Sequence, residues 1–138
     1  NFVFTLMNKP EEVLKLFTAS LDGIKRDGGI ISKYSQFMID DMVQGTEAIM
    51  VKVGTHIVPF YNITSYKSDC GNILANTLDK AVGLFTIDGE KVKISFRCLD
   101  KHSPSASDLA ITLGGGGHHN AAGAAMPLGD FLTSIVRN

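Results

Sequence analysis

The sequence Gly114-Gly115-Gly116-Gly117-His118-His119-Asn120-Ala121-Ala122-Gly123 is the most informative segment of this chain. Four consecutive glycines remove every Cβ from a loop, so its backbone can adopt positive φ angles and its N–H groups can approach a ligand closely. Such a loop is costly to order, because glycine loses more conformational entropy on folding than any other residue. The histidines that follow offer ring nitrogens that donate or accept hydrogen bonds near neutral pH. We therefore predict a ligand-binding loop here, with a flexible linker or a helix end with surplus glycine as the alternatives.

Two common phosphate-binding motifs do not fit this segment. A Walker A loop needs Lys and then Ser or Thr after its last glycine, where His118 and His119 stand. The dinucleotide-binding fingerprint needs a glycine three positions after its second one, and counting from Gly115 and Gly117 that position is Asn120. The sequence therefore indicates neither of these nucleotide sites.

A β-hairpin is the clearest signal upstream of the glycines. Two strand-like runs, residues 81–87 and 91–96, are joined by the Asp-Gly pair at 88–89, which is a strong marker of a tight turn. Side chains alternate between the two faces of a strand, so the polar residues of the second run share the face opposite the core: Lys93, Ser95 and Arg97. A guanidinium suits bidentate contact with phosphate, which makes Arg97 and Ser95 candidate ligand-binding residues. A solvated arginine or a surface ion pair is the alternative.

The first half of the chain shows helical spacing and then strand-like runs. Residues 10–23 and 30–43 are typical of two amphipathic helices, and the sequence at 26–29 predicts a turn between them. From residue 48 the period changes, and residues 48–53 and 56–61 are typical of a second hairpin.

The remaining segments predict further helices and a strand. In chain order they are a helix that begins between 65 and 69 and runs through Leu78, a helix from Ser105 to Leu113, a strand over 121–126 and a helix over 128–136. Ser68 is interpreted as a capping serine, and Gly71 lowers the helical tendency of that segment. Gly114 stands where a helix ends in the left-handed conformation, so one of the four glycines has a structural explanation. The whole pattern predicts an α/β fold with a mixed β-sheet flanked by helices.

Composition narrows the class of protein and of partner. With 138 residues the chain has material for one sizeable core, and its formal net charge of −1 argues against nonspecific binding of long duplex DNA. Its two cysteines lack a C-x-x-C spacing, which fits a reducing, cytoplasmic location. No apolar run reaches the ~20 residues of a membrane span, so no membrane partner is expected.

The segment around the glycines resembles a known family. Residues 115–123 look like the GGGHxxAAG motif of the DHH-associated domain, the C-terminal substrate-binding half of DHH phosphoesterases, which include nano-RNase/pAp phosphatase and RecJ-like proteins. Residues 92–97 resemble the strand with a Ser-x-Arg signature that precedes the motif, and residues 107–110 resemble the short helix between them. The resemblance implies the DHH-associated domain fold for residues 46–138. It also implies that residues 1–45, packed on that core, are a helical connection to an N-terminal catalytic domain.

The resemblance also implies which residues hold the substrate. The residues expected to bind its phosphate or terminal nucleotide are Arg97, Gly115, Gly116, Gly117, His118, Ser95 and Asn120. In relatives the segment that corresponds to Ser68 also approaches the substrate.

The catalytic chemistry of this family is expected outside the chain. DHH phosphoesterases use divalent metals, usually manganese, held by residues that include an Asp-His-His triplet, which this sequence lacks. We therefore expect no catalytic residue, metal site or cofactor in this fragment, and manganese in the N-terminal DHH domain of the same chain. The fragment alone is predicted to be inactive.

Three functions are compatible with the sequence. The first is a substrate-binding domain for short oligonucleotides or small phosphorylated nucleotides. The second is a non-catalytic nucleic-acid module resembling the C-terminal domain of alanyl-tRNA synthetase, which shares a Gly-rich loop. The third is a unit for homodimerisation or regulation.

Overall fold

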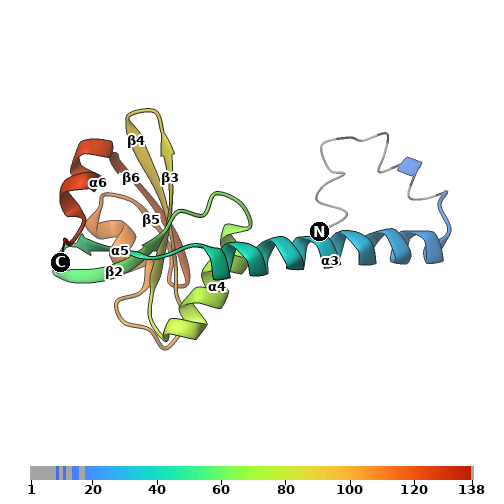
Figure 1. Cartoon of the computed structure of the whole chain (residues 1–138), viewed down its shortest axis with the longest axis horizontal. Helices are drawn as coiled ribbons and strands as arrows, with labels where there is room; N and C mark the ends of the chain where they lie inside the picture. The colour runs from blue at the N-terminus through green and yellow to red at the C-terminus, as the bar shows by residue number, and fades with distance from the viewer. Residues whose placement is uncertain (1–8, 10, 12–13, 16–17, 138) are drawn as a thin grey trace. The chain divides into compact units, whose positions relative to one another are not determined.

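The computed structural model describes residues 9, 11, 14, 15 and 18–137, and the chain divides into two compact units, 1–41 and 42–138 (Figure 1). No helix in the described part of the chain is long and apolar enough to cross a membrane. The expected role of residues 1–45 as a connection to a catalytic domain stays a prediction.

The first described helix is α3, Leu21–Gly45. It begins after Ser20, whose Oγ accepts a hydrogen bond from the backbone N–H of Gly23 at 3.1 Å. The predicted turn at 26–29 is therefore wrong, because its residues lie inside one continuous helix. A helical glycine costs only about 1 kcal/mol relative to alanine, so two of them weaken a helix without ending it. Of the helix expected over 10–23, residues 10, 12, 13, 16 and 17 lie outside the described residues, and residues 18–20 are not helical.

The second unit is built on one six-stranded mixed sheet, which confirms the predicted fold class. Its strands are β1 Ile49–Val53, β2 His56–Tyr61, β3 Val82–Asp88, β4 Lys91–Arg97, β5 Gly116–His118 and β6 Ala121–Pro127. Their order in space is β1-β2-β3-β4-β6-β5, with β2 and β3 parallel and every other neighbouring pair antiparallel. Both predicted hairpins are confirmed, and each has a positive-φ glycine at its turn, Gly54 and Gly89.

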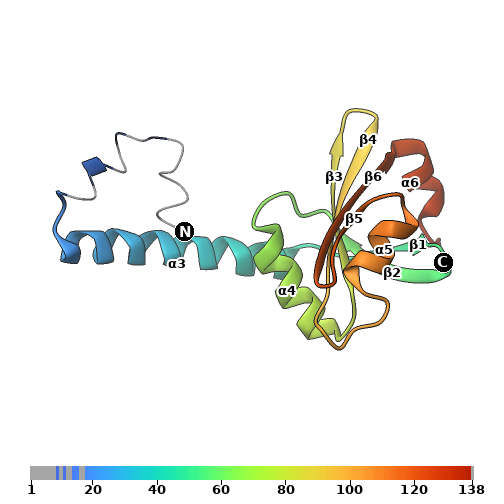
Figure 2. The same ribbon diagram turned by 180° about the vertical axis from the view of Figure 1, so that it is seen from behind.

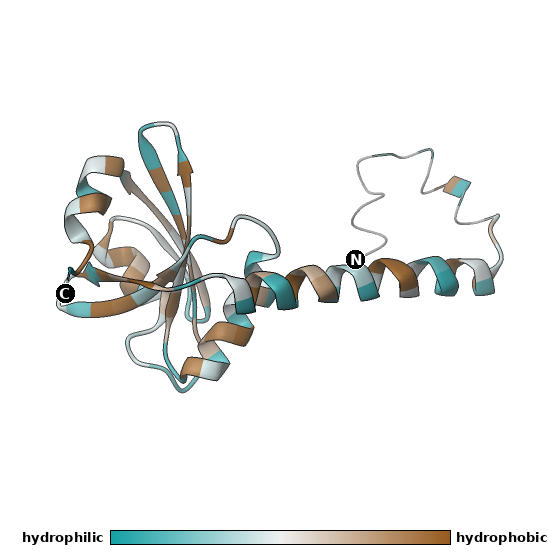
Figure 3. Cartoon of the chain, in the orientation of Figure 1, coloured by the Kyte–Doolittle hydropathy of each residue, from teal (hydrophilic) through white to brown (hydrophobic). Residues whose placement is uncertain are grey.

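Helices cover both faces of the sheet. Helix α4, Lys67–Leu78, lies on one face, while α5, Ala106–Thr112, and α6, Leu128–Ser134, lie on the other (Figures 1 and 2). Apolar and polar residues alternate along β4 (Figure 3). As predicted, its apolar residues enter the main core on the α5/α6 face: Val92, Ile94 and Phe96.

Helix α5 has a well-defined start and end. Its N-cap is Ser105, whose Oγ accepts from the N–H of Asp108 at 3.1 Å, while the Asp108 carboxylate accepts from the N–H of Ser105 at 2.9 Å. This reciprocal pair is a capping box. At the other end, Gly114 has φ +78° and donates to the carbonyl of Ile111, and Gly115 donates to the carbonyl of Ala110. The two bonds form a Schellman motif, which fixes the point where the glycine run leaves the helix.

Replacing Ser105 by alanine should lower the free energy of unfolding of the 42–138 unit by about 1 kcal/mol, because one helix N-terminal amide loses its acceptor in a site that is only 4% exposed. Chemical denaturation followed by circular dichroism measures this change. Ser103→Ala, at an exposed position just outside the helix, is the matched control and should change stability by less than about 0.5 kcal/mol. Equal stability of the two variants would show that the cap is dispensable.

Candidate ligand-binding site

One row across three strands brings Arg97 and His118 onto the same face of the sheet. Arg97 is paired with Ala121 between β4 and β6, and Ala121 is paired with His118 between β6 and β5. Directly opposed residues of antiparallel strands point to the same face, and two strand spacings separate the outer Cα atoms by roughly 10 Å. One small ligand can therefore contact both side chains. Placement of Arg97 on the other face would have excluded a shared site.

The next row on that face is almost free of side chains. Ser95 is paired with Gly123, and Gly123 with Gly116. Both glycines are exposed, and a Cβ added to Gly116 would meet no atom within 4 Å. Beside Arg97 and His118 the sheet thus presents bare backbone between Ser95 and the edge strand. A flat ligand group can approach the peptide planes there.

The glycine run forms an edge strand where the sequence predicted a loop. Gly116–His118 pair with β6 as strand β5, so the expectation of a loop over Gly115–Gly117 is wrong for most of its length. The run lies very close to its neighbour. A Cβ on Gly115 would overlap the carbonyl oxygen of Gly123 and stand 2.8 Å from Cα of Ala124, and one on Gly117, at φ +148°, would stand 2.6 Å from Cα of Ala122.

These contacts change the explanation of the four glycines. The sequence explained only Gly114 by structure, whereas close approach to β6 also requires glycine at 115 and 117. Gly116 is the one member of the run with no steric reason and with φ outside the left-handed region. Its missing side chain leaves the outer surface of the sheet open.

Arg97 is held by two hydrogen bonds on the α4 face. Its Nη1 donates to the carbonyl of Phe96 at 2.9 Å, and its Nη2 donates to Oγ of Ser68 at 3.1 Å. Within the described ranges no carboxylate forms an ion pair with it. Burial lowers the pKa of Arg97, but a guanidinium remains protonated in proteins. The site therefore holds a half-buried positive charge that no carboxylate of the described residues neutralises.

The contact of Ser68 was missed by the sequence interpretation. The N-cap of α4 is Tyr66, in the left-handed conformation and without a side-chain cap, so the capping role assigned to Ser68 is wrong. Ser68 and Arg97 are 29 positions apart, and no local pattern could have joined them.

The turn between β5 and β6 is fastened to the loop that follows β4. The side-chain amide of Asn120 donates to the carboxylate of Asp100 at 2.5 Å, and the backbone carbonyl of Asn120 accepts from the N–H of Cys98 at 3.2 Å. The carbonyl of His119 accepts from the N–H of Ala106 at 2.9 Å. Asn120 thus helps to fix the turn that orients His118, and its expected contact with substrate stays a prediction. His118 itself is exposed.

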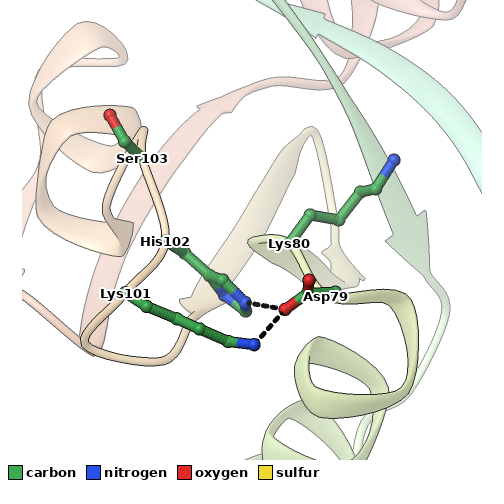
Figure 4. A pocket seen from close by; sticks show the side chains of 5 residues that line it. All are labelled: Asp79, Lys80, Lys101, His102 and Ser103. Carbon is green, nitrogen blue, oxygen red and sulfur yellow. Dashed lines mark hydrogen bonds and ion pairs between the residues drawn. The ribbon is translucent and has the colours of Figure 1, made fainter.

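A pocket of about 300 Å³ lies at the C-terminal end of α4, lined by Asp79, Lys80, Lys101, His102 and Ser103 (Figure 4). His102 is only 7% exposed, and its Nδ1 accepts from the N–H of Leu99 at 3.1 Å. Its Nε2 therefore carries the proton and donates to the Asp79 carboxylate at 3.2 Å. Lys101 pairs with the same oxygen at 2.5 Å, so this cluster ties the loop after β4 to α4.

The interaction of the Asp79 carboxylate with Lys101 and His102 should make the stability of the protein depend on pH. The hydrogen bond from Lys101, then the hydrogen bond from His102 and the charge of Lys101, lower the pKa of Asp79 below its ordinary value of 3.8. Because the folded-state pKa is the lower one, the stabilisation is complete above the unfolded pKa and is lost as pH falls through the folded pKa. The stability difference between wild type and Asp79→Asn, measured by denaturation over a pH series, should shrink in that acidic range. Lys80→Ala removes a pocket residue that makes no ion pair with Asp79, and its effect should not follow this titration.

Alanine substitutions within the glycine run should separate structural from surface positions. Gly115→Ala and Gly117→Ala should each lower the free energy of unfolding by a few kcal/mol, roughly the cost of overpacking. Gly116→Ala should leave stability within about 0.5 kcal/mol of wild type, because its Cβ enters open space. Thermal or chemical denaturation provides the measurement. Equal losses at 115, 116 and 117 would contradict the strand pairing described above.

The residues of the candidate site lie in a part of the chain that matches a known protein family. The family model described as "DHHA1 domain" matches residues 67–137, slightly more than half of the chain and all of it from α4 to α6. This match confirms the resemblance seen in the glycine-histidine motif. No curated protein matches the chain. Among the described residues, no cluster of three His, Cys, Asp or Glu side chains could hold a metal ion.

Proposed function

The chain belongs to the DHHA1 domain family, and from this membership we propose that it is the substrate-binding part of a DHH phosphoesterase. Domains of this family sit beside an N-terminal DHH domain in the same chain and are associated with DHH phosphoesterases. The finer assignment of phosphate binding to Arg97, His118 and the glycine segment rests on the geometry of the site.

The row Arg97–Ala121–His118 is the observation that carries this proposal. A guanidinium has five N–H donors in a fixed fork, and the described structure engages two of them, with Phe96 and Ser68. The others remain for an oxyanion, and charge-assisted bonds of this kind are the strong ones. His118 can add a ring N–H from the edge strand β5, two strands away from Arg97.

The neighbouring row Ser95–Gly123–Gly116, which is almost free of side chains, can accommodate the rest of a nucleotide. Ser95 offers a hydroxyl, while Gly116 and Gly123 leave space for a sugar or base to lie against the sheet. A surface of this size accommodates a small ligand, and the formal net charge of −1 gives no extended basic track for a long duplex. We therefore propose short oligonucleotides or small phosphorylated nucleotides as substrates.

Phosphodiester cleavage also needs an activated water, and the described residues do not fit a metal site. We assign that part to a DHH domain, where divalent metals, manganese in our proposal, supply Lewis-acid chemistry. The residues of this chain bind and orient the phosphate, which lowers the barrier by positioning.

The full product of the gene, assayed with manganese and the 5′-phosphorylated dinucleotide pApA, should hydrolyse it. Arg97→Ala and His118→Ala should each lower kcat/KM by roughly ten- to a hundredfold, the loss expected for one charge-assisted hydrogen bond. Arg137→Ala and His56→Ala, at exposed positions near β1 at the sheet edge opposite β5, are matched controls and should retain wild-type activity.

Two outcomes would contradict the proposal. Activity unchanged by both site variants would remove Arg97 and His118 from substrate binding. Binding of a tRNA in preference to pApA, without hydrolysis, would favour the module resembling the C-terminal domain of alanyl-tRNA synthetase.

A further inference from the structure

We propose that Ser68 and Gly71 on α4 are positioning residues, which together set the orientation in which Arg97 meets the phosphate. This inference rests on the proposed function of Arg97 and adds a second element, α4, to the site. Neither residue needs to touch the substrate for this role.

Gly71 provides the space that the arginine stem occupies. A Cβ at residue 71 would stand 2.6 Å from Cγ and 3.0 Å from Cβ of Arg97, and 3.1 Å from Cδ1 of Leu84. Contacts below 3.0 Å essentially never occur, so the arginine stem and any side chain at 71 cannot both remain in place. Glycine inside a helix costs about 1 kcal/mol relative to alanine. In α4 this cost falls at the position where the helix packs directly against the side chain of Arg97.

Ser68 fixes the other end of the same side chain. It lies three positions before Gly71 and therefore on the same helix face, one turn away. Its Oγ accepts from Nη2 of Arg97 at 3.1 Å, while the carbonyl of Phe96 accepts from Nη1 at 2.9 Å. One acceptor comes from the helix and the other from the strand, and together they fix the plane of the guanidinium.

Ser68 has no competing structural role in the described part of the chain. It is exposed, it does not cap α4, and its hydroxyl accepts the hydrogen bond from Arg97. A serine that served only as a polar residue on the helix surface would not need to lie within hydrogen-bond distance of Arg97. Ser68 and Gly71 therefore act by holding the side chain of Arg97 in place. A displacement of about 1 Å in a substrate-binding group can lower the rate on the order of a hundredfold.

The test combines Arg97 NMR signals with titration of the chain by pApA. Ser68→Ala and Gly71→Ala should shift and broaden the side-chain N–H signals of Arg97 and weaken pApA binding by roughly tenfold. Ser68→Thr, which keeps the hydroxyl, should restore both readouts. Gly129→Ala, at a helical glycine whose Cβ would meet nothing, is the control and should change neither.

A double-mutant cycle separates positioning from a general loss of structure. In an Arg97→Ala background, Ser68→Ala and Gly71→Ala should produce no further loss of pApA binding, because the group through which they act is absent. Additive losses would overturn the inference, as would Arg97 signals that neither variant alters. If wild type fails to bind pApA, the proposed function falls, and the inference that rests on it falls too. If Arg97→Ala weakens binding and the two α4 variants do not, only the inference falls.

Discussion

Backbone contact between the glycine segment and β6 is the constraint on which this structure depends. A Cβ at Gly115 or Gly117 would collide with β6, so those positions let β5 pair at the sheet edge. That pairing sets the register in which His118 stands in one row with Arg97. The cost of ordering the glycines is offset by ladder hydrogen bonds and by the Schellman motif that ends α5. The stability of the sheet edge and the geometry of the candidate site thus depend on the same few peptide groups.

The two faces of the sheet differ in how completely helices cover them. On one face, α5 and α6 cover the main core, whose aromatic residues pack around Phe60 and Phe131. On the other face α4 covers only part of the sheet, and the rows that contain Arg97 and Ser95 extend beyond it toward the exposed edge strand. Arg97 lies half-buried at this boundary, where burial partly desolvates its guanidinium. Desolvation strengthens its attraction for an anion.

Local patterns in the sequence predicted the parts of the fold that depend on near neighbours. The alternation in β4, the Asp88-Gly89 turn, the Ser105 cap and the left-handed Gly114 are each encoded within a few residues, and the structure confirms them. The reasons for Gly71, Gly115 and Gly117 are close contacts with other segments of the sheet and its helices. From the sequence, Gly71 therefore appeared only unfavourable, and Gly115 and Gly117 were assigned to a ligand-binding loop. The strand β5 was missed because two of its three residues are glycines, which are depleted in strands and carry no strand signal. The pairing of Arg97 with Ser68, and of His102 with Asp79, likewise appears only in three dimensions.

The two-residue turn His119-Asn120 has a consequence for how this family segment can change in length. Side chains on a strand alternate with a period of two, so a shift of one position in the pairing moves each of them to the opposite surface. Insertion or deletion of a single residue between His118 and Ala121 could therefore carry the imidazole from the α4 side to the α5 side of the sheet, leaving the guanidinium behind. Substitutions at 119 and 120 leave the count intact. Natural variation at residues 119 and 120 should accordingly change the amino acids more often than the number of residues in the turn.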